Sequence, residues 1–316
     1  MLSRRIIRIK TMQVLFSDAI GKDILPVVLE KALMESIKDT KKLYYTYLIY
    51  LVEIANYSVI YSSKQASKML FDSKNAFIST KIASNRVIQQ VSESKEYQDY
   101  INFNKLHSLI NKKIVKDLFI SLITKEKYLN YVEKKITTEE DDKEILRYII
   151  KKVIGSSKEL DDDVAEHFTN IEDDQYYALI SLQKKLKYFD NKKDSLFLHN
   201  FLLQENKDEV IDFAKNLLTR FYDHEDELVG IIKPKLKNWD IERIAVIDIV
   251  MVKMAICELK YFPNIPVKVT INEYIDLAKE YSSDKSKDFM NGILDKIMKD
   301  LQEKGEVKKQ GRGLIN

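Results

Sequence analysis

Residues 265–301 read IPVKVTINEYIDLAKEYSSDKSKDFMNGILDKIMKDL, and this stretch decides the fold. Its apolar residues recur every three or four positions on both sides of a short polar segment, which is the rhythm of two amphipathic helices. We expect these helices at about 271–281 and 288–301. Pro263 and Pro266 precede them and predict a rigid turn, because proline fixes its own φ and restricts the residue before it. The stretch holds no recognisable catalytic combination of residues.

The same helical rhythm extends through the rest of the chain, which predicts an all-α protein. Seven glycines and four prolines in 316 residues are too few for the turns of an all-β fold. Hydrophobic residues make up 45% of the chain, enough to bury a substantial core. Further helices are expected at 3–17, along a run that begins at Thr40, and at about 76–91, 106–122, 208–222, 225–237 and 245–259.

The middle of the chain carries a tyrosine stripe and two acidic runs. The stripe, which includes Tyr44 and Tyr47, has the spacing of a core helix, and packing is a commoner role for such a stripe than stacking on nucleic-acid bases. Residues 139–142 and 161–163 are acidic, and each run precedes an apolar one. Acidic side chains are favourable in the first turn of a helix, so we expect helix starts there rather than calcium loops, which have a different spacing.

Charge and cysteine content narrow the class of protein. The net charge of +3 is too small to indicate nucleic-acid binding by itself, so any such surface must come from local clustering. The single Cys257 excludes a disulfide framework and a cysteine-based zinc site. It lies in an apolar run, which predicts a buried, inert thiol in a reducing, cytoplasmic protein. We expect no bound metal, no cofactor and no transmembrane helix, since the four histidines are scattered and no long apolar run occurs.

Several residues of this pattern resemble the NusB family of bacterial transcription antitermination factors. The C-terminal resemblance is specific and rests on these residues of the expected turn and helices: Asn272, Glu273, Phe289, Asn291 and Gly292. Upstream, Trp239-x-x-x-Arg243, Asp248 and the run from Ala255 to Leu259 match in the same order. Residues 3–17 are similar to the first helix of the family, with an arginine-rich opening followed by Gln13-Val14-Leu15-Phe16.

The resemblance implies an all-α, NusB-like helical bundle that carries an inserted helical subdomain, because family members are commonly much shorter. We expect a first NusB-like helix in residues 1–20 and an insertion or elaborated N-terminal subdomain in 21–206. The C-terminal NusB-like region then covers 207–303, and a flexible tail covers 304–316. One departure is Lys285, which stands where the family usually has an acidic residue before Phe289.

The resemblance also implies a function without catalysis. Family members bind the boxA RNA of ribosomal operon leaders together with NusE, a small-subunit ribosomal protein, and this complex joins RNA polymerase and suppresses premature termination. The expected RNA-binding residues are Arg4, Arg5, Arg8 and Lys10, since guanidinium groups donate paired hydrogen bonds to phosphate and stack on bases. The alternative is that these arginines are exposed to solvent and have no role in RNA binding.

The remaining expectations concern protein contacts and rival functions. Tyr261, Phe262 and Lys268, beside the proline turn, are candidates for the contact with NusE, because aromatic residues are enriched at binding hot spots. Asn272 and Glu273 are expected to cap a helix, and Gly292 to allow a close approach between helices. No small-molecule substrate is expected. The rival functions are a helical protein-interaction scaffold that does not bind RNA, and the RNA-binding domain of an RNA methyltransferase.

Overall fold

The computed structural model describes residues 3–21, 24–69, 79–169, 171–189, 207–238 and 244–314. Every regular element in these ranges is a helix, which confirms the all-α prediction. The chain divides into two compact units, which we call unit 1 (residues 38–205) and unit 2 (residues 2–37 and 206–316). Unit 2 is therefore built from two stretches of chain, and its first boundary falls inside a helix. None of the described helices is long and apolar enough to cross a membrane.

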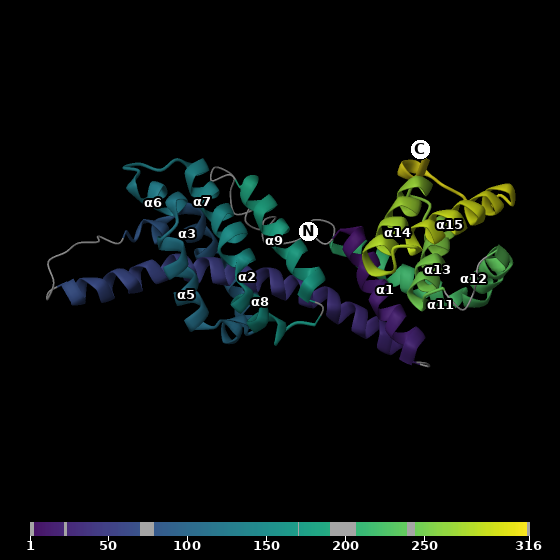
Figure 1. Ribbon diagram of the computed structural model, residues 1–316, viewed down its shortest axis with the longest axis horizontal. Helices are drawn as coiled ribbons and strands as arrows, with labels where there is room; N and C mark the ends of the chain where they lie inside the picture. Colours follow the sequence, from purple (N-terminus) through teal and green to yellow (C-terminus); the bar gives the residue numbers. More distant parts are fainter. Residues whose placement is uncertain are drawn as a thin grey trace. The chain divides into compact units, whose positions relative to one another are not determined.

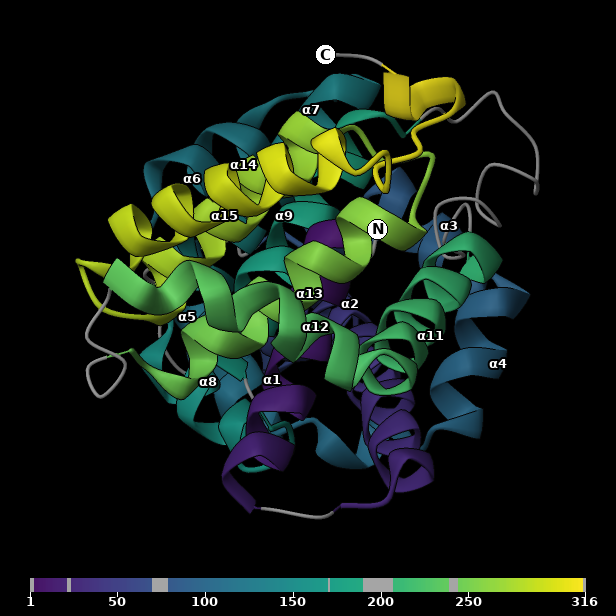
Figure 2. The same ribbon diagram turned by 90° about the vertical axis from the view of Figure 1, so that its right-hand side faces the viewer.

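Unit 2 is organised around its most apolar helix, α13 (Figures 1 and 2). The elements of unit 2 are α1 (Arg4–Gly21), the start of α2 (Pro26–Met69), α11 (Lys207–Asp223), α12 (Glu225–Ile232), η4 (Lys233–Asn238), α13 (Val246–Tyr261), α14 (Val267–Tyr281), α15 (Ser286–Glu303) and η6 (Gly311–Leu314). Helices α1, α11, α12, α14 and α15 all pack against α13. A helix that is apolar on all sides must be covered on all sides. This explains why nearly all of α13 from Val250 to Leu259 is buried.

The thiol of Cys257 lies inside this packing, as its sequence predicted. Burial raises the pKa of Cys257, because the interior disfavours the thiolate. An uncharged, enclosed thiol is a poor nucleophile. Cys257 therefore fills space in the core.

Two helix starts in unit 2 differ from the prediction. Helix α14 begins at Val267, four residues before the expected start, with Pro266 at its N-cap. Proline is compatible with a helix start because the first backbone N–H groups have no partner within the helix. Asn272 and Glu273 therefore lie inside α14, and the prediction that they cap this helix is wrong. Helix α15 begins at Ser286 rather than 288.

Unit 1 has a core of its own, centred on the second part of α2. Its other elements are η1 (Lys81–Ser84), α3 (Arg86–Glu93), α4 (Lys95–Phe103), η2 (Leu106–Leu109), α5 (Lys112–Ile123), α6 (Glu126–Glu133), α7 (Glu139–Lys152), η3 (Ile154–Ser156), α8 (Lys158–Ala165) and α9 (Ile171–Lys187). The stretch of α2 from Leu43 to Ala55 is buried almost without interruption. Tyr47 is fully buried and Tyr44 nearly so, which confirms that the tyrosine stripe belongs to the core.

Two asparagines break helices that the periodicity predicted as continuous. The expected helix at 76–91 is a short 3-10 turn followed by α3, and residues 76–78 lie outside the described part of the chain. Asn85 ends the turn and caps α3, its side chain accepting hydrogen bonds from two backbone N–H groups of that helix. Asn111 caps the start of α5, inside the expected helix at 106–122, and its side chain accepts one hydrogen bond from the backbone N–H of Lys113. Asparagine is among the best N-cap residues, so both breaks have a local cause.

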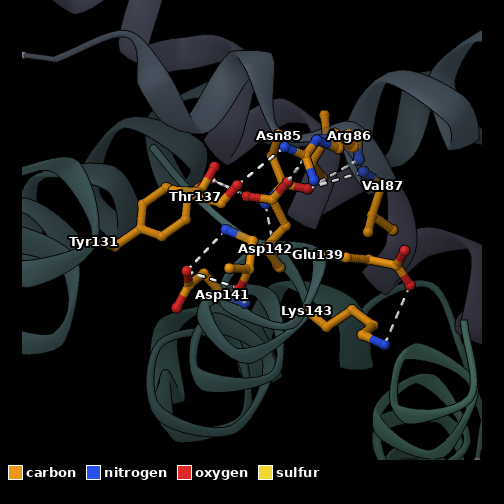
Figure 3. A network of polar contacts seen from close by, with 11 residues as sticks. Asn85, Arg86, Val87, Tyr131, Thr137, Glu139, Asp141, Asp142 and Lys143 are labelled. Carbon is orange, nitrogen blue, oxygen red and sulfur yellow. Dashed lines mark hydrogen bonds and ion pairs between the residues drawn. The ribbon is translucent and has the colours of Figure 1, made fainter. Parts of the chain in front are cut away.

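Asn85 also belongs to a buried network that joins α3, α6 and α7 (Figure 3). Its amide nitrogen donates to the backbone oxygen of Asp142 at 3.0 Å and to the hydroxyl of Tyr131 at 3.3 Å. That hydroxyl donates in turn to a carboxylate oxygen of Asp142 at 2.7 Å. The other carboxylate oxygen accepts from the backbone of Arg86. The network thus fixes the positions of α3, α6 and α7 relative to one another, through one amide, one hydroxyl and one carboxylate.

The first acidic run behaves as predicted. Residues 139–142 form the first turn of α7, where Thr138 and Asp141 make a reciprocal capping box. The second run does so only in part, because α8 is capped by Ser157 and only Asp161 of that run lies in its first turn. Within the described residues, no group of three or more His, Cys, Asp and Glu side chains is placed to hold a metal ion.

Candidate nucleic-acid interface

The three arginines at the start of α1 have three different environments. Arg8 is 2% exposed and forms a two-pronged ion pair with Glu258 of α13. Its Nε atom lies 2.8 Å from Oε2 of that glutamate, and its Nη2 atom lies 2.6 Å from Oε1. Its third nitrogen donates to Glu273 of α14 at 3.2 Å. Arg8 thus ties α1 to two helices that lie some 250 positions away in the sequence.

Glu258 is fully buried, and its carboxylate is satisfied from several directions. Thr270 donates a hydrogen bond to Oε1 at 2.8 Å and Tyr274 donates to Oε2 at 3.4 Å, in addition to the two bonds from Arg8. Burial alone would lower the pKa of Arg8, but the hydrogen bonds and the charge of Glu258 outweigh it and raise that pKa. Arg8 and Glu258 thus form a buried ion pair, and removing either partner would strand the other in the interior.

Arg5 lies at the edge of the same cluster and is partly exposed. One of its guanidinium nitrogens is 2.8 Å from Glu280, and another is 3.5 Å from Glu273. Arg4 is exposed and its guanidinium lies over the ring of Phe213, 5.8 Å from the ring centre. Among the described residues, no hydrogen bond or ion pair joins Arg4 to an acidic side chain. Of the three arginines, Arg4 is the one whose charge is most available to a ligand.

Two of the expected RNA-binding residues are therefore not at the surface. Arg8 is committed to Glu258, and Lys10 is only 1% exposed. A cation must reach solvent to neutralise a phosphate, so direct RNA contact by these two side chains does not fit their burial. Thr11, on the same side of α1 as Arg8, is also fully buried. From Arg8 to Thr11, the polar side of α1 is thus an internal contact surface.

The turn that carries the expected partner contacts is partly occupied by contacts within unit 2. The ring of Tyr261 stacks on His224, with ring centres 4.3 Å apart, and its hydroxyl donates to Glu227 at 2.6 Å. Phe262 is half-buried and makes an edge-to-face contact with Phe213. Lys268 is exposed. Only Lys268 of the three is fully accessible to a partner in this structure.

The C-terminal segment follows the same turn, which the sequence did not predict. Gly305, with φ of 67°, ends α15 in a Schellman motif, in which the backbone N–H groups of Gly305 and Glu306 donate to carbonyl oxygens in the last turn of the helix. The ammonium of Lys309 then donates to the backbone oxygens of Glu258 and Phe262 at 3.1 and 3.0 Å. Gln310 donates its backbone N–H to Pro263 at 2.9 Å. These bonds give the predicted flexible tail fixed partners at the end of α13.

The remaining signature residues divide between core and surface. Phe289 is 4% exposed, whereas Asn272 and Asn291 are exposed and Gly292 is half-exposed. Asp248, in the first turn of α13, accepts a 2.7 Å hydrogen bond from the hydroxyl of Ser286, which links the starts of α13 and α15. Lys285, the departure from the family pattern, is the N-cap residue of α15. The motif with Trp239 and Arg243 lies outside the described residues.

An open hollow lies between α11, the start of α1 and the proline turn. It has a volume of about 660 Å³, and Arg4 and Arg220 are among its lining residues, together with Asp212 and Tyr261. The sequence gives no sign of this site, because its members lie on three segments that no local pattern connects. A second, smaller hollow of about 530 Å³ lies beside it, lined in part by Arg5 and Glu273.

Comparison with known proteins identifies the family of this chain. The NusB family pattern matches residues 176–299. Three proteins called transcription antitermination protein NusB are similar, those of Finegoldia magna (40% identical over 94 residues), Salinibacter ruber (42% over 104) and Chloroherpeton thalassium (38% over 105). The aligned part covers 68%, 65% and 50% of these relatives respectively, and 30%, 33% and 33% of this chain. The chain belongs to the NusB family.

The matched region and the compact units do not coincide. The NusB pattern begins at residue 176, inside α9 of unit 1, and ends at residue 299 in α15 of unit 2. Helix α1 lies outside the matched residues, yet it packs on α13 through Arg8. The boundaries expected at 20/21 and 206/207 stay a prediction. In the structure, the units change over at 37/38 and 205/206.

Proposed function

We propose that this protein is a transcription antitermination factor that binds boxA-type single-stranded leader RNA together with the ribosomal protein NusE. In this role it joins an RNA polymerase complex and suppresses premature termination, notably in ribosomal RNA operons. The observation that carries the proposal is the 40% identity to a NusB antitermination protein over two thirds of that protein's length. We place the protein in the cytoplasm and assign it no catalytic reaction, cofactor or small-molecule substrate.

The RNA surface in this proposal is the exposed rim of unit 2 at the start of α1. Arg4 has no acidic partner among the described residues, and Arg5 is partly exposed, so both can approach phosphates. Arg8 supports them from the interior by fixing α1 on α13. Phosphate contacts of this kind fix the register and orientation of a protein on a nucleic acid.

We propose the NusE contact at the proline turn, centred on Lys268. This lysine and its neighbour Val269, which is 43% exposed, form an accessible edge at the start of α14. Tyr261 and Phe262 support the turn through their contacts with His224 and Phe213. A turn held in this way loses little conformational entropy on binding.

The test is formation of a three-part complex. The full-length protein, purified NusE and a fluorescein-labelled boxA-type RNA are combined, and RNA anisotropy is measured with and without NusE. We expect NusE to tighten RNA binding and Lys268→Glu/Val269→Ser to abolish that gain without changing binding to RNA alone. Lys279→Glu/Val246→Ser, which changes an exposed lysine and an exposed valine elsewhere in unit 2, is the control. RNA binding that is absent under all conditions would favour the scaffold function instead.

A further inference from the structure

The hollow beside the arginine rim combines charges of both signs that are not paired with each other. It is lined by Arg4 and Arg220 and by the carboxylates of Glu209 and Asp212. Within the described part of the chain, no ion pair or side-chain hydrogen bond occupies any of these four groups. A ligand that fills this site must therefore present anionic oxygens to the arginines and hydrogen-bond donors to the carboxylates.

Aromatic rings hold both arginines in place. The guanidinium of Arg220 lies 5.5 Å from the ring centre of Tyr261, and that of Arg4 lies 5.8 Å from the ring centre of Phe213. Such cation–π contacts fix a guanidinium while leaving its N–H groups able to donate. Guanidinium planes are also surfaces on which unstacked RNA bases are stacked.

Glu209 and Asp212 come from one face of α11. They are three positions apart, so their side chains are neighbours on the helix, and both are exposed. A carboxylate accepts two parallel hydrogen bonds from a group with two adjacent donors. Guanine has such an edge, formed by its N1–H and N2 amino groups, whereas uracil and adenine offer fewer adjacent donors.

From these contacts we propose that the hollow is a binding site for one guanine nucleotide of a single-stranded RNA. Arg4 and Arg220 bind the flanking phosphates and Asp212, supported by Glu209, reads the base edge. The volume of about 660 Å³ lies within the range typical of small-ligand pockets. The inference rests on the proposed RNA-binding function and adds to it a base preference and a residue, Arg220, that lies outside the arginine-rich start of α1.

The test uses the full-length protein and four nonamer RNAs, in which a central guanosine, inosine, adenosine or uridine is flanked by four uridines on each side. Inosine lacks only the N2 amino group, so it removes one donor of the proposed pair. We expect the guanosine nonamer to bind about tenfold more tightly than the inosine nonamer, which is the loss of one charge-assisted hydrogen bond. Arg220→Gln should weaken all four RNAs by a similar factor.

The decisive variant is Glu209→Gln/Asp212→Asn, which should bind guanosine and inosine nonamers equally. Its control, Asp276→Asn/Glu303→Gln, changes the same charge at two exposed positions outside the hollow and should keep the tenfold ratio. Equal binding of all four RNAs by the unaltered protein overturns the guanine site and leaves RNA binding intact. Failure of the unaltered protein to bind any of these RNAs, or a boxA-type RNA with NusE, overturns the proposed function itself.

Discussion

Units 1 and 2 each contain a buried polar network. The two networks differ in how far apart their residues lie in the sequence. In unit 1, Asn85 and Asp142 are 57 positions apart, and the Asp142 carboxylate accepts hydrogen bonds from neutral donors, with the guanidinium of Arg86 further off at 3.8 Å. In unit 2, Arg8 and Glu258 are 250 positions apart and form a buried ion pair. The comparison teaches that unit 1 can assemble from one continuous stretch, whereas unit 2 needs both ends of the chain.

This difference also bears on function. The helix that opens the chain presents Arg4 and Arg5 only if Arg8 reaches Glu258, so the proposed RNA surface depends on a contact between distant segments. Long-range contacts are entropically costly to form. A buried ion pair between distant segments, Arg8–Glu258, therefore supports the candidate interface of unit 2 from the interior.

The largest expected effect comes from breaking the unit 2 pair. Glu258→Leu leaves the guanidinium of Arg8 buried without its main partner, which costs about 3–5 kcal/mol. We expect hydrogen exchange of the α13 amides to accelerate by the corresponding factor, while the amides of α7 in unit 1 are unaffected. The control Glu280→Gln, at an exposed pair, should cost about 0–1 kcal/mol.

A second variant tests whether the loss of stability comes from the unpaired Arg8 guanidinium. Arg8→Met/Glu258→Leu replaces the whole pair with apolar side chains and should recover most of the lost stability, because buried pairs are often replaceable by packed hydrophobic residues. A loss below about 1 kcal/mol in Glu258→Leu would contradict the central place given to this pair.

The next effect concerns unit 1. Asn85→Ala removes the cap of α3 and one donor to the Asp142 backbone, which together cost about 1–3 kcal/mol. Hydrogen exchange should accelerate in α3 and α7 and stay unchanged in α13. Asn102→Ala, at an exposed position in α4, serves as the control. Equal acceleration in both units would show that they unfold together, which would contradict the assembly of unit 1 from its own continuous stretch.

The third prediction concerns the pH dependence of unit 2. Burial lowers the pKa of Lys309 to about 8, below its ordinary value of 10.5. Between these two values the unfolded chain binds more protons than the folded one, so this group makes stability rise as pH increases through that window. We expect the free energy of unfolding of Lys309→Met to rise less between pH 8 and 10 than that of the unaltered protein. Parallel curves from chemical denaturation would remove Lys309 as the cause.

The smallest effect is a stabilisation in unit 1. Lys105 has a left-handed backbone with φ of 52°, a conformation that is unfavourable for a residue with a side chain. Lys105→Gly should relieve this strain and stabilise unit 1 by about 0.5–1 kcal/mol. Lys112→Gly, within the first turn of α5, should instead destabilise it. Thermal unfolding that moves in the same direction for both variants would contradict this account.

Elements with a regular apolar rhythm could be predicted from the sequence. The tyrosine stripe of α2 and the α13 run were assigned to the core correctly, because periodicity reports burial directly. Helix breaks at Asn85 and Asn111 were missed, although asparagine before an apolar run is a recognised start signal. At both positions the asparagine caps a new helix, although the apolar periodicity continues across the break.

The site was harder to predict because its contacts are not local. Arg8 has the sequence appearance of a surface cation, and nothing near it in the chain indicates that Glu258 will bury it. The hollow with Arg220 depends on three distant segments in the same way. Of the four residues expected to bind RNA, only Arg4 and Arg5 are exposed enough to reach a phosphate.

The most direct test of the account is the salt dependence of boxA-type RNA binding by matched variants of the two units. Arg4→Gln/Arg5→Gln removes two positive charges at the start of α1 in unit 2. Lys112→Gln/Lys116→Gln removes two exposed positive charges of unit 1. Each phosphate contact on single-stranded RNA adds about 0.7 to the slope of log affinity against log salt. We predict that the unit 2 variant loses about 1.4 from this slope and that the unit 1 variant keeps it. An unchanged slope in the unit 2 variant, with the loss appearing in the unit 1 variant, would contradict the account.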